Sequence, residues 1–88
     1  MKFLYRLFEG VSQTPDNQKH KTYGIRAYRQ NGHGWLCAAE VSDISSDQKF
    51  VLRLVWWYNQ LQLAPEHLKD IVQDAIVYEN SNISKAIS

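Results

Sequence analysis

The sequence predicts an α+β fold of order βββαα, in which a three-stranded antiparallel β-meander is followed by two helices packed on one face. Apolar residues alternate with a period of two in the first half of the chain and recur about every 3.6 residues in the second half. Strands and helices are thus segregated along the sequence, which is typical of α+β domains. The 88 residues suffice for one domain, which we place at residues 1–79.

The first two strands are predicted from alternation on either side of a polar segment. Phe3, Tyr5 and Leu7 form one apolar face of the first strand. The polar segment 10–18 contains Thr14-Pro15-Asp16-Asn17, a good turn sequence, and we expect a long hairpin connection of about nine residues. Alternation then resumes over residues 19–30. Its apolar face consists of Tyr23, Ile25 and Ala27.

The third strand follows an Asn31-Gly32 pair, a strong hairpin signal between alternating runs. We expect it to present one buried face, formed by Trp35, Cys37, Ala39 and Val41. Cys37 would then be a small buried hydrophobe without reactivity. Each strand therefore offers one apolar face for burial, as in a sheet covered on a single side.

Two helices are predicted for the second half. Ser45 with Gln48 fits a capping box at the start of the first helix, and Pro65 suits the first turn of the second. We expect residues 80–88, which are rich in Ser and Asn, to form a polar, disordered tail. The buried stripe of the first helix is predicted to be Phe50, Val51, Leu54, Trp57, Tyr58 and Leu61.

Composition narrows the class of protein. With 44% hydrophobic residues, 22% charged residues and a net charge of +1, the chain is not of the disordered type. The low charge also argues against a dedicated polyanion binder. A single cysteine favours a reducing cytoplasm. Arg6 and Glu9 interrupt the signal-like N-terminus, and no apolar run is long enough to span a membrane.

Catalytic and metal-binding signals are absent from the sequence. His20, His33 and His67 have no metal-ligand spacing, and no serine lies in a nucleophile motif. Acidic pairs such as Asp70 and Asp74 fall on the polar side of a helix, where solvation explains them. We therefore predict a non-enzymatic protein without cofactor, metal or small-molecule substrate.

The Trp56-Trp57-Tyr58 run suggests a protein interface. At about 100° per residue the three aromatic side chains cannot all face one sheet. Trp56 falls among polar positions with Leu52 and Leu63 nearby, and these three residues form the predicted contact surface of an interaction or regulatory module, possibly a homodimer. The alternative is that the second helix folds back and covers Trp56.

Charge distribution suggests a second, less favoured function. Residues 1–35 contain six basic and two acidic side chains, whereas residues 36–88 contain four and seven. The outer face of the predicted sheet would carry basic and aromatic side chains suited to weak binding of a nucleic-acid strand. Those side chains are Lys2, Arg6, Arg26 and Tyr28.

Several segments together resemble a family of uncharacterised small proteins of Gram-positive bacteria. The resemblance extends over about residues 2–79, with Ala64 standing where such relatives usually have Ser before the proline. It implies a βββαα domain and supplies no activity, cofactor or catalytic residue. The segments that carry it are Thr22-Tyr23-Gly24-Ile25, Val41-Ser42-Asp43-Ile44-Ser45-Ser46-Asp47, Leu54-Val55 with Asn59, and Leu63-Ala64-Pro65-Glu66-His67-Leu68-Lys69-Asp70-Ile71-Val72-Gln73-Asp74.

Overall fold

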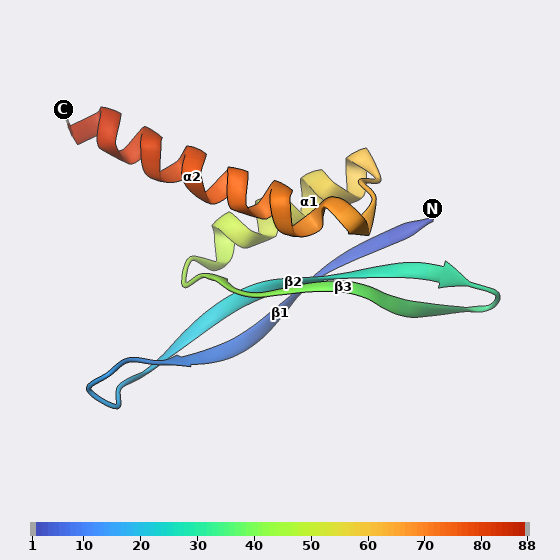
Figure 1. The fold of residues 1–88 in the computed structure, drawn as a ribbon, viewed down its shortest axis with the longest axis horizontal. Coiled ribbons are helices and arrows are strands. Elements are labelled where there is room, and N and C mark those ends of the chain that lie inside the picture. Colours follow the sequence, from blue (N-terminus) through green and yellow to red (C-terminus); the bar gives the residue numbers. More distant parts are fainter. Residues whose placement is uncertain (1, 88) are drawn as a thin grey trace.

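A three-stranded sheet and two α-helices form two layers (Figure 1). The computed structural model describes the backbone of residues 2–87 and the side chains of residues 2–78. The strands are antiparallel in the order β1-β2-β3, and the helices follow them, which confirms the predicted α+β meander. The elements are β1 (Phe3–Gln13), β2 (Lys19–Asn31), β3 (Gly34–Ser45), α1 (Gln48–Leu61), the 3-10 helix η1 (Pro65–His67) and α2 (Leu68–Ile87).

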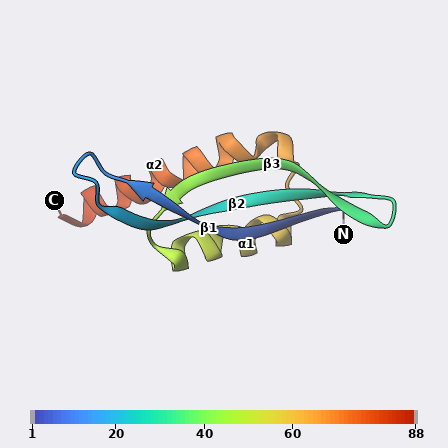
Figure 2. The same ribbon diagram turned by 90° about the horizontal axis from the view of Figure 1, so that it is seen from below.

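Both helices lie on the same face of the sheet. Seen from below, α1 runs beside β1 and α2 beside β3 (Figure 2). We call the opposite face, which neither helix covers, the open face. The core lies between the layers, where Tyr5, Ile25 and Ala27 of the strands are buried as predicted. The other buried apolar residues of this core are Ile44, Val51, Tyr58, Leu68 and Val72.

The first hairpin is tighter than the sequence predicted. Strand β1 continues to Gln13 and β2 begins at Lys19, so the connection has five residues and not about nine. Thr14 donates its backbone N–H to the carbonyl of Gln18 at 2.9 Å, and Asn17 takes up a positive φ of 65°. These turn contacts let the polar residues on either side of the connection pair as strand.

A β-bulge in β3 corrects the predicted placement of Trp35 and Cys37. Ala27 pairs with Ala39, but the next residue of β2, Tyr28, pairs with Cys37, so Ala38 is an extra residue in β3. Partners across an antiparallel pair share a face, and one extra residue reverses the alternation beyond it. Cys37 is therefore exposed on the open face with Tyr28, and only the Ala39–Val41 part of the predicted set turns toward the helices.

Helix α1 starts two residues later than the predicted capping box. Asp47 is its N-cap, and its carboxylate accepts hydrogen bonds from the backbone N–H groups of Lys49 and Phe50. Ser45 lies outside the helix, where its hydroxyl accepts from the N–H of Asp47 at 3.0 Å. A carboxylate at this position also suits the positive end of the helix dipole.

Two side-chain amides of α1 and its C-cap hold the free edge of β1. The Asn59 side chain accepts from the N–H of Tyr5 at 2.8 Å and donates to the carbonyl of Tyr5 at 2.9 Å. Gln62 does the same for Phe3, at 3.1 and 3.0 Å. We call these contacts the amide clamp. Since an edge strand otherwise exposes these backbone groups, the clamp protects the edge and sets the rotation of α1.

Helix α2 follows η1, whose first residue is Pro65 as predicted. Its bounds extend to Ile87, further than the predicted end near residue 79. The predicted disordered tail at residues 80–88 falls where side chains lie outside the described residues, and it stays a prediction. No helix in the described part of the chain combines the length and apolar character needed to cross a membrane.

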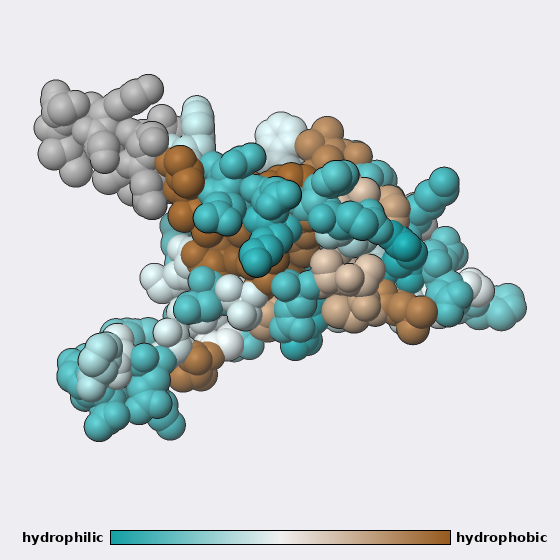
Figure 3. Space-filling view, viewed as in Figure 1, coloured by the Kyte–Doolittle hydropathy of each residue, from teal (hydrophilic) through white to brown (hydrophobic). Residues whose placement is uncertain are grey.

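The molecule is long and flat, with extents of 48 × 32 × 19 Å. Its radius of gyration is 14.5 Å, against about 12 Å expected for a rounded domain of this length. The β2–β3 hairpin projects beyond the helices and the β1–β2 hairpin diverges from α2 (Figure 1), and the β1–β2 end has a hydrophilic surface (Figure 3). Apolar side chains gather instead between α2 and the sheet (Figure 3).

Candidate interaction surface

The solvent side of α1 carries four large apolar residues. Their exposed fractions are 47% for Leu52, 57% for Trp56, 52% for Trp57 and 60% for Leu61. We call these four residues the tryptophan face. Leu52 and Trp56 are neighbours on the helix surface, and so are Trp57 and Leu61, and exposed apolar neighbours of this kind form patches that isolated soluble proteins usually avoid.

Two of these residues were predicted to be buried. Trp57 and Leu61 were assigned to the core stripe, but α1 is rotated so that Val51 and Tyr58 point into the core. Tyr58 packs against Tyr5 with ring centroids 5.7 Å apart, and the amide clamp fixes the same rotation from the β1 side. Trp57 is one residue before Tyr58, and it is therefore turned toward solvent.

The predicted surface residues divide between the tryptophan face and the core. Leu52 and Trp56 are exposed, and α2 leaves Trp56 uncovered. Leu63 is partly buried and packs against the core, and its carbonyl accepts a hydrogen bond from the Tyr5 hydroxyl. The candidate surface therefore includes Trp57 and Leu61 and excludes Leu63.

A polar strip separates the apolar residues into two pairs. At about 100° per residue, Lys49, Arg53 and Gln60 run along the middle of the exposed side. Leu52 and Trp56 flank the strip on one side, and Trp57 and Leu61 flank it on the other. The two indole rings meet edge to face, with centroids 5.2 Å apart and an interplanar angle of 83°. Since α1 contains no Asp or Glu, its surface is positively charged.

Two phenol groups lie beneath this surface. Burial raises the pKa of Tyr58 to about 12, and the neighbouring Tyr5 adds to the effect. Burial also raises the pKa of Tyr5 to about 12, with a smaller contribution from Glu66. Both groups are neutral near pH 7, and they support α1 from the core side.

The open face contains a second cluster. Leu4, Arg6, Tyr28 and Trp35 line a shallow pocket of about 320 Å³. The bulge in β3 places Trp35 here, which alternation alone did not predict. Arg26, the next predicted residue, already contacts Glu40 at 3.6 Å and lies 4.3 Å above the Phe8 ring. Arg6 and Tyr28 are thus brought together, and the charge of Arg26 is partly neutralised.

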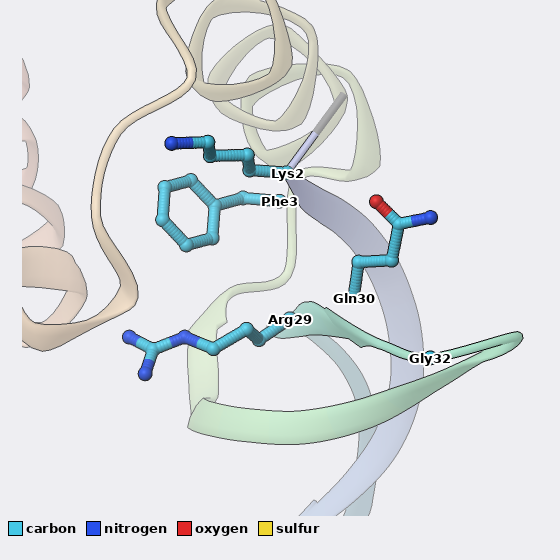
Figure 4. A pocket seen from close by; sticks show the side chains of 5 residues that line it. All are labelled: Lys2, Phe3, Arg29, Gln30 and Gly32. Carbon is cyan, nitrogen blue, oxygen red and sulfur yellow. The ribbon is translucent and has the colours of Figure 1, made fainter.

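Lys2 does not join that cluster. Its side chain extends beside Phe3, on the same side as Arg29, while Gln30 points away (Figure 4). These residues line an open pocket of about 460 Å³ together with Gly32. Arg29 is hydrogen-bonded to Glu66 of η1 and lies 5.7 Å from the centre of the Phe3 ring. The predicted set of Lys2, Arg6, Arg26 and Tyr28 is therefore split between two places.

Titratable side chains are dispersed over the structure. Among the described residues, no three His, Cys, Asp or Glu side chains gather in a group that could hold a metal ion. Cys37 is exposed, and its thiol lies 3.7 Å from the carbonyl oxygen of Ala39.

Comparison with known proteins gives a family match over nearly the whole chain. Residues 1–77 match the model of a protein family, which is described as a family of unknown function. This match confirms the predicted membership of an uncharacterised family. No curated protein and no solved structure matches the chain.

Proposed function

Because the chain belongs to the DUF6514 family, a family of unknown function, we propose its function from its own geometry. We propose that it is a non-enzymatic interaction module of the cytoplasm, which binds another protein chain through the tryptophan face. The exposed free thiol of Cys37 supports a reducing compartment.

The observation that carries the proposal is the pair of adjacent indoles, each more than half exposed. Tryptophan is enriched at the energetic centres of protein interfaces, because its large apolar area is buried with little loss of side-chain entropy. Arg53 lies next to both indoles on the helix surface, and Trp and Arg together are typical of such centres. The rest of α1 is anchored by the core and by the amide clamp, so this surface is held rigidly.

Photo-crosslinking in the native cells tests this proposal. A photoreactive phenylalanine analogue replaces Leu52 in the tryptophan face, and a matched control carries it at Val11, an apolar residue of β1 that is 69% exposed. We expect discrete protein adducts from position 52 alone, and we expect Trp57→Glu to abolish them. Adducts that form equally at both positions, or that persist in Trp57→Glu, contradict the proposal.

A second candidate function is weak binding of a single-stranded nucleic acid on the open face. Its supporting observation is the pocket in which Arg6 lies with Tyr28 and Trp35, since aromatic rings stack on bases and guanidinium groups contact phosphates. A labelled oligonucleotide is titrated at low and moderate salt, with Tyr28→Ala as the variant and Trp56→Ala as the control. Salt-dependent binding lost only in Tyr28→Ala supports this candidate, and the absence of binding at tens of micromolar excludes it.

A further inference from the structure

Two cations lie between the indoles on the exposed side of α1. Lys49 and Arg53 are one helical turn apart, and Arg53 lies next to both Trp56 and Trp57. At about 100° per residue, these four side chains fall within about 100° of the helix circumference, which is the width of the stripe that a single neighbouring element covers. The two leucines of the tryptophan face stand at the edges of this stripe.

The two cations have no carboxylate partner among the described residues. The three ion pairs formed within residues 2–78 involve other basic side chains, and none includes Lys49 or Arg53. The carboxylate nearest to them along the chain, that of Asp47, accepts hydrogen bonds from backbone N–H groups at the start of α1. Because like charges one turn apart on a helix repel each other, a carboxylate placed between Lys49 and Arg53 would relieve this repulsion and contact both groups.

We infer that the partner segment that binds the tryptophan face is acidic, with carboxylates on Lys49 and Arg53 and with apolar side chains against the two indoles. The inference rests on the proposed function and names the chemistry of the partner. A guanidinium group can bind a carboxylate through two parallel hydrogen bonds, and apolar neighbours that exclude water strengthen such a pair. A second α1 helix contains no Asp or Glu, so it does not supply this chemistry.

The position of α2 distinguishes a protein segment from a flat anionic membrane surface. Both helices lie on the same face of the sheet (Figure 2), and α2 carries Asp70 and Asp74 at exposed positions. A flat surface lying on α1 would also face these two carboxylates, which an anionic lipid layer repels. A narrow segment that follows α1 contacts Lys49 and Arg53 and leaves α2 uncovered. The charges of the two helices therefore favour an acidic segment of a protein.

Charge reversal in the cellular crosslinking experiment is the first test. The photoreactive residue at position 52 is combined with Lys49→Glu or Arg53→Glu, and with Lys69→Glu as the matched control, because Lys69 is an exposed cation of α2. We expect each reversal on α1 to reduce the adducts at least about 10-fold, and we expect Lys69→Glu to leave them unchanged. Arg53→Lys, which keeps the charge, should retain more adducts than Arg53→Gln. Far-ultraviolet circular dichroism verifies that each variant is folded.

Mapping the adduct is the second test. Mass spectrometry identifies the partner peptide that is joined to position 52, and we expect Asp and Glu to outnumber Lys and Arg near the joined residue. Exchanging one of these partner carboxylates for Lys should restore adducts in Arg53→Glu, because opposite charges then face each other again. A neutral or basic partner segment, or no restoration at any carboxylate near the joined residue, overturns the inference.

Lipid vesicles test the membrane alternative with the purified chain. Tryptophan fluorescence is recorded with vesicles of phosphatidylglycerol, which is anionic, and of phosphatidylcholine, which has no net charge. We expect neither kind of vesicle to change the spectrum. Binding to phosphatidylglycerol that both Lys49→Glu and Arg53→Glu abolish would assign this surface to lipid and overturn the acidic protein segment.

The outcomes separate this inference from the proposed function. Adducts that are lost in Trp57→Glu but kept in Lys49→Glu and Arg53→Glu overturn the acidic partner and still support the interaction module. If the chain forms no adducts from position 52 in the absence of any further substitution, the proposed function fails and the inference fails with it.

Discussion

Two neighbouring phenols show how individual residues can have different roles in the same environment. The rings of Tyr5 and Tyr58 meet at 68° in the core beneath α1. The Tyr5 hydroxyl donates to the carbonyl of Leu63, whereas the buried Tyr58 hydroxyl has no partner among the described residues. The first hydroxyl therefore ties β1 to the segment after α1. The second residue, Tyr58, stabilises the core only through the apolar area that its ring buries.

Tyr58→Phe is expected to change the free energy of unfolding little at pH 7 and to change its pH dependence. The folded pKa near 12 lies above the ordinary value of 10, so between these values the phenol is protonated in the folded protein and ionised in the unfolded chain. The free energy of unfolding is therefore unaffected by this ionisation below pH 10, and it falls as the pH rises toward 12. In that pH range each such phenol lowers the free energy of unfolding by about 1.4 kcal/mol per pH unit. Urea unfolding at several pH values should show a shallower alkaline decline for Tyr58→Phe, and an unchanged slope contradicts the expectation.

Tyr5→Phe is the informative comparison. This substitution also removes one phenol that ionises at alkaline pH, but at pH 7 it leaves the Leu63 carbonyl without its hydrogen bond. We therefore expect Tyr5→Phe to lower the free energy of unfolding by about 1–2 kcal/mol at pH 7, where Tyr58→Phe is nearly neutral.

Gly24 is required by a close approach within the sheet. A Cβ atom at this position would lie 2.5 Å from the carbonyl oxygen of Val41 and 2.7 Å from the Phe8 ring. The ring can move, but the backbone of β3 cannot move without disturbing the ladder. We expect Gly24→Ala to cost about 2–3 kcal/mol in chemical denaturation. Gly34→Ala is the control, because nothing lies within 4 Å of its Cβ position, and a similar loss there would refute the steric explanation.

Single elements show which features could be predicted from the sequence. Alternation identified the helix-facing residues of β1 and β2, including Tyr5, Ile25 and Ala27, because those strands pair without irregularity. It misplaced Cys37, because the bulge at Ala38 is a backbone feature that a side-chain pattern does not reveal.

Helix rotation explains the other error. The apolar pattern of α1 extends around most of its circumference, so it admits more than one buried side. The choice is made by Asn59 and Gln62, whose polar side chains bind the edge of β1. Trp57 is consequently exposed, and half of the candidate surface could not be found by periodicity.

The amide clamp yields a prediction at the scale of the element. Asn59→Ala removes two hydrogen bonds to the backbone of Tyr5 and is expected to lower the free energy of unfolding by about 1–3 kcal/mol. Hydrogen exchange at the Tyr5 amide should accelerate as well. Gln73→Ala, at an exposed position of α2, should change neither quantity. If the Tyr5 amide remains equally protected in Asn59→Ala, the clamp does not stabilise the edge.

The whole molecule is a sheet longer than the helices that cover it. The central part of β2 is buried, while residues 15–20 and 31–36 in and beside the two hairpin turns are exposed. We expect hydrogen exchange to follow this division, with amides of residues 14–20 and 31–36 exchanging at least about 100-fold faster than those of residues 24–28. Uniform protection along β2 would contradict this expectation.

The amide clamp has a further consequence for how freely β1 can vary. The side chains of Asn59 and Gln62 bind backbone groups of Lys2, Phe3 and Tyr5, and nearly every amino acid possesses such groups. These hydrogen bonds therefore depend on the position of the strand, whereas the packing of the Tyr5 ring on Tyr58 depends on its side chain. We therefore expect substitutions at exposed positions of β1 to leave the orientation of α1 unchanged, and a substitution at Asn59 or Gln62 to change the direction in which the tryptophans point.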